Sequence, residues 1–196
     1  MFPRLSSTVI PKLFSTQVTR KEPEEACALR ENIPRGKNRV PYTIKVGESV
    51  HGFKLEAVDR IEMFDITAYR LTHEATGARY LHLDTADSDN VFAVLFRTPP
   101  DDHTGKPHIL EHLATCGTAK YPVRDPFFNM IKRSLNTYMN AWTGSDFTMY
   151  PFSTQNVKDF RNLLSVYLEM SFFPRLDAQD FRQEGHRLEF KEWNDP

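Results

Sequence analysis

The chain has 196 residues and a formal net charge of −1, with 40% hydrophobic and 26% charged residues. This balance is typical of one globular domain of ordinary size, and it excludes a nucleic-acid-binding mode that depends on a strongly basic surface. No apolar run approaches the roughly 20 residues of a membrane span, and the 2 cysteines are too few for a disulfide scaffold.

The first 21 residues differ from the rest of the chain in charge and composition. They contain no acidic residue and are rich in serine and threonine. This composition is typical of a mitochondrial transit peptide, although a disordered basic tail would have the same character. Residues 22–45 are polar and contain proline, which predicts a linker, so the globular domain is expected to span residues 46–196. The basic residues of the first segment are Arg4, Lys12, Arg20 and Lys21.

The domain is expected to begin with β-strands. Polarity alternates along residues 52–58, and the segments 66–73 and 79–83 flank a turn, which predicts a β-hairpin. His73 and His82 alternate with apolar neighbours in these segments. They are therefore expected to be cross-strand residues and not metal ligands.

The next segments lead from a strand into a short helix. The apolar, β-branched and aromatic run 91–96 predicts a buried strand, and the proline- and aspartate-containing stretch 98–106 predicts a loop. Pro107 suits the first turn of a helix and Gly117 suits its end. A helix is therefore expected between these two residues.

This helix carries the pattern H-x-x-E-H. His108 and His112 are four residues apart, so both imidazoles are expected on one helix face, where they can bind one zinc ion. Glu111 precedes the second histidine and can accept a proton from a zinc-bound water. This order is typical of the inverzincin metallopeptidases, although a pair of surface histidines gives the same pattern by chance.

Neither cysteine is expected to bind the metal. Cys27 and Cys116 lack a partner at C-x-x-C spacing, which argues against a cysteine-ligated zinc. Cys116 follows His112 by four residues, so it is expected to be a small packing residue on the same helix face.

Helices and one further strand are predicted in the second half. Asp125 and Pro126 are typical of a helix start, which predicts a helix at residues 127–133. Residues 146–152 alternate in polarity and predict a strand. Asn156 is expected to cap a long helix. Strands followed by helices predict an α+β fold with a largely antiparallel sheet and packed helices.

The long helix is expected to contribute to the core, because its apolar side chains recur at helical spacing. The segment 172–174 is expected to end it, and residues 180–189 are expected to form another helical or extended segment. A cofactor site on this face is not expected. The predicted core residues are Phe160, Leu163, Leu164, Tyr167, Leu168 and Ser171.

Several stretches resemble the pitrilysin-type (inverzincin) metallopeptidases, and in particular those that degrade peptides in mitochondria. The resemblance covers the chain from about His51 to Glu189. It implies the N-terminal part of a pitrilysin-type domain, also described as LuxS/metallohydrolase-like. The matching stretches are residues 76–83, 107–112, 121–122, 124–128, 139–141, 150–156, 163–168 and 183–185.

The resemblance also implies a function. It implies a zinc metalloendopeptidase of the mitochondrial matrix that degrades cleaved presequences and other short unstructured peptides. Zn²⁺ is then the cofactor and peptides are the partners, with no nucleic acid and no membrane insertion. A C-terminal half of the full-length enzyme, absent from this sequence, is expected to complete the peptide chamber.

The resemblance assigns roles to five residues. His108 and His112 are expected to bind zinc, and Glu111 is expected to be the general base that activates a zinc-bound water. Asn140 and Ala141 are expected to lie on an edge strand that receives the substrate as an added strand. Without the resemblance, Asn140 would be read as a turn residue.

A third zinc ligand is expected beyond Pro196, where the family places a glutamate. Glu189 follows His112 by 77 positions, the spacing of the ligand in other branches of the family, but the local match places it ahead of the ligand. Glu184 is expected to orient a histidine from outside the coordination shell. His186 stands where the family usually has tryptophan, a difference that no argument from the sequence explains.

Two alternative functions remain open at this point. The chain can be a non-catalytic peptide-binding fragment or isoform that lacks the third zinc ligand. It can also be a subunit similar to the mitochondrial processing peptidase, which shares the H-x-x-E-H motif and the compartment but cuts once at a defined site.

Overall fold

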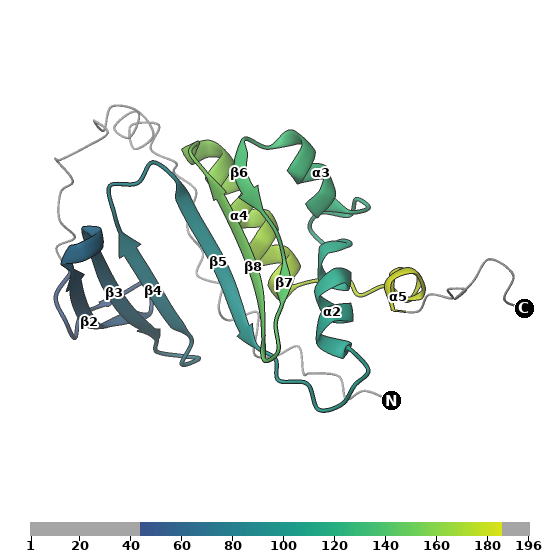
Figure 1. The fold of residues 1–196 in the computed structure, drawn as a ribbon, viewed down its shortest axis with the longest axis horizontal. Coiled ribbons are helices and arrows are strands. Elements are labelled where there is room, and N and C mark those ends of the chain that lie inside the picture. Colours follow the sequence, from purple (N-terminus) through teal and green to yellow (C-terminus); the bar gives the residue numbers. More distant parts are fainter. Residues whose placement is uncertain (1–43, 186–196) are drawn as a thin grey trace, which may run out of the picture. The chain divides into compact units, whose positions relative to one another are not determined.

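The computed structural model describes residues 44–185, which form two compact units that divide between Ala86 and Asp87. Figure 1 shows the elements of both units. The predicted transit peptide and most of the predicted linker lie outside the described residues, as do His186 and Glu189. No helix within residues 44–185 is both long and apolar enough to cross a membrane.

The first unit is a four-stranded antiparallel sheet in which each strand pairs with the next along the chain. The hairpin predicted from the sequence is present, and Gly77 has a φ of 71° in its turn. Such a positive φ carries no steric cost for glycine. The strands are β1 (Ser49–Val50), β2 (Phe53–Ile61), β3 (Ile66–His73) and β4 (Arg79–Asp84), and a 3-10 helix spans Glu62–Phe64.

The two histidines of this sheet are cross-strand residues, as predicted. His73 lies opposite Phe53 on the neighbouring strand, with ring centroids 4.7 Å apart. His82 lies opposite Tyr69, with ring centroids 5.9 Å apart. Both rings therefore take part in the pairing of the sheet.

The second unit combines an antiparallel sheet with four helices, which confirms the predicted α+β class. β8 is the central strand, because β5 pairs with one side of it and β6 and β7 with the other. The strands are β5 (Asn90–Arg97), β6 (Asn136–Met139), β7 (Trp142–Thr143) and β8 (Phe147–Thr154). The helices are α2 (Lys106–Thr115), α3 (Pro126–Arg133), α4 (Val157–Phe172) and α5 (Ala178–Glu184).

The prediction that residues 91–96 form a buried strand is wrong in one respect. The strand is present as β5, but Val91 and Leu95 are 69% and 60% exposed. Phe92 and Phe96 alternate with them and pack against the core. The reason is layering: α4 packs on the face that carries Phe96, whose ring centroid lies 5.6 Å from that of Phe172. A strand in this place buries one face, so its pattern alternates.

The two predicted helix starts differ in their capping. Asn156 caps α4 as predicted, and its Oδ1 accepts a hydrogen bond of 3.0 Å from the backbone N–H of Asp159. Asp125 precedes α3 as predicted, but its side chain makes no capping hydrogen bond. Its φ of 51° is left-handed, a conformation that aspartate tolerates better than most residues.

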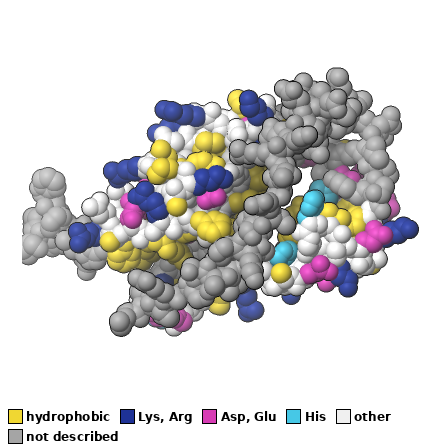
Figure 2. Space-filling model, turned by 180° about the vertical axis from the view of Figure 1, so that it is seen from behind, with side chains coloured by type: hydrophobic (Ala, Val, Ile, Leu, Met, Phe, Trp, Pro, Cys, Tyr) yellow, Lys and Arg dark blue, Asp and Glu magenta, His cyan; other side chains and the backbone are white. Residues whose placement is uncertain are grey.

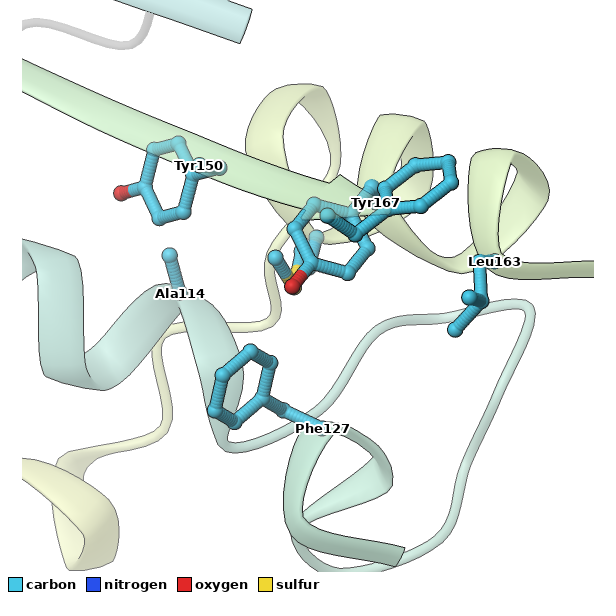
Figure 3. Packing of buried hydrophobic residues seen from close by; sticks show 7 residues of the cluster. Ala114, Phe127, Tyr150, Leu163 and Tyr167 are labelled. Carbon is cyan, nitrogen blue, oxygen red and sulfur yellow. The ribbon is translucent and has the colours of Figure 1, made fainter. Parts of the chain in front are cut away.

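The core of the second unit joins three helices to β8. Figure 3 shows Ala114 of α2 and Phe127 of α3 beside Tyr150 of β8 and Tyr167 of α4. Tyr167 is fully buried, and its hydroxyl donates a hydrogen bond to the backbone O of Pro151 at 3.0 Å. The aromatic rings interdigitate at centroid distances such as the 4.8 Å between Phe152 and Tyr167. This packing holds α2 against the sheet.

The predicted face of α4 forms much of this core. Leu163 and Tyr167 are fully buried, and Phe160 and Leu164 pack against the cluster. Val166 and Met170 are also buried, although the sequence reading did not single them out. Hydrophobic side chains also remain on the surface (Figure 2). In the second unit they include Val91, Leu95, Phe128, Leu135, Tyr138, Trp142 and Phe181.

Candidate metal centre

The H-x-x-E-H motif lies on α2, as predicted. The helix begins after Gly105, whose φ of 71° turns the chain out of the preceding loop, and Pro107 lies in its first turn. Proline is favoured there because its missing N–H would have no partner within the helix. The helix ends at Thr115, so the motif occupies its central turns.

The two histidines face each other on the exposed side of α2. Their Nε2 atoms are 3.2 Å apart, and their ring centroids are 4.8 Å apart. Two nitrogens that bind one tetrahedral zinc at 2.0–2.1 Å lie about 3.3 Å from each other. The spacing of His108 and His112 therefore fits two ligands of one zinc ion. Together with Glu111 they form a cluster whose ligand atoms lie within 4.8 Å of one another.

Glu111 lies on the buried side of this cluster. Its residue is 7% exposed, and its Oε2 accepts a hydrogen bond of 2.9 Å from Oγ1 of Thr143 on β7. Burial, and to a lesser degree the charge of Glu111, raises the pKa of Tyr150 to about 12. Tyr150 therefore stays neutral at physiological pH. The carboxylate is held between the helix and the edge of the sheet, beside both imidazoles.

Glu184 approaches the same cluster from α5. Its Oε2 lies 3.0 Å from Nδ1 of His112, on the side of the ring opposite Nε2. The hydrogen bond with His112 is the main cause that lowers the pKa of Glu184 below its ordinary value. A carboxylate at Nδ1 orients an imidazole and fixes its tautomer, which is the arrangement common around metal-binding histidines.

Asn140 and Ala141 lie at the edge of the sheet, but they interrupt the strand. β6 ends at Met139 and β7 begins at Trp142, and both strands pair with β8. The backbone N–H of Asn140 still donates to the O of Pro151 at 3.1 Å. Its side-chain Oδ1 accepts a hydrogen bond of 2.9 Å from the N–H of Ala141. Asn140 and Ala141 therefore lie between two strands of this edge, and not on an edge strand as the resemblance had implied.

Cys116 is a half-buried packing residue at the end of α2. Its Sγ lies 3.4 Å from the backbone O of His112. Burial, followed by the nearby carboxylates, raises the pKa of this thiol to about 11. The thiol is therefore protonated at neutral pH, in agreement with the packing role expected from the sequence.

Two contacts of the cluster were not predicted from the sequence. Thr143, which donates to Glu111, lies in no recognisable motif and is brought close by the pairing of β7 with β8. Gln183, which contacts Glu184, was noted only as part of a matching stretch. A polar residue beside a predicted orienting glutamate is a weak signal, because helix surfaces are usually polar.

Comparison with known families identifies a match to the second unit. The family described as Insulinase (Peptidase family M16) matches residues 97–195. This range contains α2 with both histidines and Glu111, and it extends past α5. The matched region therefore includes all the described residues of the cluster.

Curated proteins similar to this chain are much longer than it is. The mitochondrial presequence protease of Mus musculus is 59% identical over 152 residues, which cover 78% of this chain and 15% of that protein. The corresponding protein of Drosophila melanogaster is 52% identical over 160 residues, which cover 82% and 16%. The chain thus spans about 15% of the length of these relatives.

Among solved structures, the crystal structure of pitrilysin has a similar fold. The TM-score is 0.58, the sequence identity is 18%, and the match covers 68% of this chain and 15% of that one. At this level of identity the likeness concerns the fold, and it confirms the predicted pitrilysin-type architecture.

Proposed function

Because the chain belongs to the insulinase family of peptidases (family M16), we propose that it carries part of the active site of a zinc metalloendopeptidase. The observation that supports this most directly is the distance of 3.2 Å between Nε2 of His108 and Nε2 of His112. Glu111 lies within the same cluster. Catalytic zinc sites keep three protein ligands, so the proposal requires a third donor from outside the described residues.

The proposed roles of the chain's own residues follow from these contacts. Bound zinc would supply Lewis acidity, which polarises a carbonyl and lowers the pKa of water. Glu111 accepts the proton of the attacking water and passes it to the leaving amine. Oε2 of Glu111 already accepts a hydrogen bond from Thr143, so we propose that Oε1 accepts the proton of the water. His108 and His112 hold the metal through Nε2.

The proposed substrate is an extended peptide that adds to the edge formed by β6 and β7. Backbone pairing at a sheet edge tolerates varied side chains, which suits the degradation of many peptides. Ala141 donates its N–H to Oδ1 of Asn140. A peptide strand that hydrogen-bonds to this N–H has to displace the Asn140 side chain. Asn140 would therefore compete with the substrate for this donor.

The names of the relatives suggest the biological setting. Both relatives described above are named mitochondrial presequence proteases. We therefore propose that cleaved presequences and other short unstructured peptides are the substrates, and that the protein works in the mitochondrial matrix. A second candidate, a peptide-binding fragment without catalysis, is favoured by the presence of only two imidazole donors in the described cluster.

Zinc binding and peptide cleavage test the proposal, measured on a form of the protein as long as its relatives so that the third donor is present. Competition with a chromogenic chelator should show one zinc per chain, and His108→Ala should abolish it. His103→Ala is the matched control, because this exposed histidine lies in the loop before α2 and outside the cluster. A chain in which both variants bind zinc equally would refute the metal site.

Cleavage of a quenched presequence peptide separates the candidate functions. The endopeptidase predicts several products and their loss in Glu111→Gln, which should retain zinc. Retained turnover in Glu111→Gln would refute the role of this glutamate. A single cleavage product would favour a processing-peptidase-like activity, and peptide binding without cleavage would favour the non-catalytic fragment.

A further inference from the structure

A chain of side-chain hydrogen bonds leads from the surface to His112. Nη2 of Arg124 donates to Oε1 of Gln183 at 2.7 Å, and Nε2 of Gln183 donates to Oε1 of Glu184 at 2.9 Å. The other oxygen of Glu184 then lies 3.0 Å from Nδ1 of His112. Four side chains from the α2–α3 loop, α5 and α2 are thus connected in series.

The partners fix the orientation of each group in this series. Arginine can only donate, so it selects the carbonyl oxygen of Gln183 and turns the amide NH₂ towards Glu184. An ionised carboxylate can only accept, so Nδ1 of His112 carries the proton and donates it to Glu184. The lone pair of His112 is then on Nε2, which is the atom that faces His108.

The position of Glu184 depends on polar contacts. α5 has no buried residue, and Phe181 on this helix is 50% exposed. Side-chain hydrogen bonds join the helix to the rest of the second unit through Gln183, which contacts Arg124, and through Glu184, which contacts His112. The Arg124–Gln183 bond is therefore one of the contacts that can keep Glu184 in place.

We propose that Arg124 and Gln183 are positioning residues that hold Glu184 against His112 and thereby fix the His112 tautomer that binds zinc. This inference rests on the proposed function of His108 and His112 as zinc ligands. Gln183 touches neither the metal nor the substrate and acts through Glu184. Loss of a residue that contacts a metal ligand commonly weakens metal binding about 10- to 100-fold. Gln183 contacts the ligand His112 only through Glu184, so we expect the lower end of that range.

Gln183→Met in the same long form of the protein tests the proposal, because it keeps the length of the side chain and removes both amide groups. We expect the zinc dissociation constant to rise about tenfold. We also expect the ¹⁵N chemical shifts of His112 to move from the Nδ1–H form towards a mixture of tautomers. Gln179→Met is the matched control, because Gln179 is exposed one turn earlier on α5. It should change neither quantity.

A double-mutant cycle shows whether Gln183 acts through Glu184. In a Glu184→Ala background, Gln183→Met should cause no further loss of zinc affinity. Equal losses in the presence and absence of Glu184 would overturn the proposal, as would an unchanged dissociation constant in Gln183→Met. Arg124→Met provides a second, independent variant with the same expected outcome. Failure of His108→Ala to reduce zinc binding would instead refute the proposed metal site.

Discussion

α2 and α5 meet at the contact between His112 and Glu184, but different forces hold the two helices. α2 buries Glu111, Leu113, Ala114 and Thr115, and Ala114 is part of the core shown in Figure 3. α5 buries no residue. The proposed metal donors therefore lie on an element held by packing, whereas the group that orients one donor lies on an element without buried side chains, which depends more on hydrogen bonds.

The two helices should differ in how strongly the loss of a single polar contact affects their position. Apolar burial is spread over many contacts, so the loss of one polar contact leaves a packed helix in place. A helix without buried side chains lacks these distributed contacts. Its position therefore depends more strongly on a few directional hydrogen bonds. Zinc affinity should therefore respond to polar changes on α5 and stability to apolar changes on α2.

Amide hydrogen exchange should show the largest contrast. The opening free energies of α5 amides are expected to lie near zero, whereas those of the central amides of α2 should approach the global free energy of unfolding, about 5–15 kcal/mol. The measurement is native-state exchange of the 196-residue chain, resolved by residue with NMR. Equal protection of the two helices would remove the distinction between them.

Truncation of an apolar side chain should lower the free energy of unfolding by a few kcal/mol more on α2 than on α5. Leu113→Ala is expected to lower the free energy of unfolding by about 2–5 kcal/mol, because Leu113 is buried on α2. The control on α5, Phe181→Ala, should change it by less than about 1 kcal/mol, because this ring is half exposed. Urea denaturation monitored by circular dichroism gives both values. Similar losses for the two variants would contradict the inference that apolar burial holds α2 but not α5.

Removal of a polar contact of α2 should affect stability without moving the helix. Thr143→Val keeps the shape of the side chain but removes the hydroxyl donor of Glu111. We expect a loss of about 1–2 kcal/mol in the free energy of unfolding, since a buried carboxylate loses a partner. The relative exchange protection along α2 should stay the same in this variant. Thr143→Ser, which keeps the donor, should recover most of the loss.

Acid should reduce the exchange protection of α5 before that of α2, and this is the smallest of the four expected effects. A carboxylate whose pKa is lowered by folding stabilises the folded form above its ordinary value of 4.5, and this contribution disappears as the pH falls through the lower folded value. The exchange protection of α5 relative to α2, corrected for intrinsic rates, should therefore fall below pH 4.5. Glu184→Gln should show no such step, because glutamine does not titrate in this range.

Local patterns in the sequence predicted most of the fold. The hairpin, the caps and the helical spacing of α4 each depend on a few neighbouring residues, and the structure confirms them except for the side-chain cap of Asp125. The burial of β5 was predicted wrongly, because the same apolar run suits a central strand and a strand that buries one face. Only the layers that pack on each face of the sheet, a long-range property, distinguish the two.

The candidate site shows the same division between local and long-range information. The spacing of His108, Glu111 and His112 follows from one helix and could be read from the sequence. Thr143 and Gln183 reach the cluster from β7 and α5, through strand pairing and helix packing that no local pattern specifies. Glu184 was anticipated only through the family resemblance, although its contact with His112 is a simple hydrogen bond.

The break between β6 and β7 has a consequence for the behaviour of the protein in concentrated solution. A long, regular edge strand offers its free backbone groups to other chains and promotes aggregation. Here the edge is divided at Asn140 and Ala141, and the register of β6 with β8 also shifts between Asn136 and Tyr138. Two interruptions leave short stretches of β6 and β7 for pairing, which suffices for the added peptide strand proposed above and disfavours extended pairing between copies of the chain.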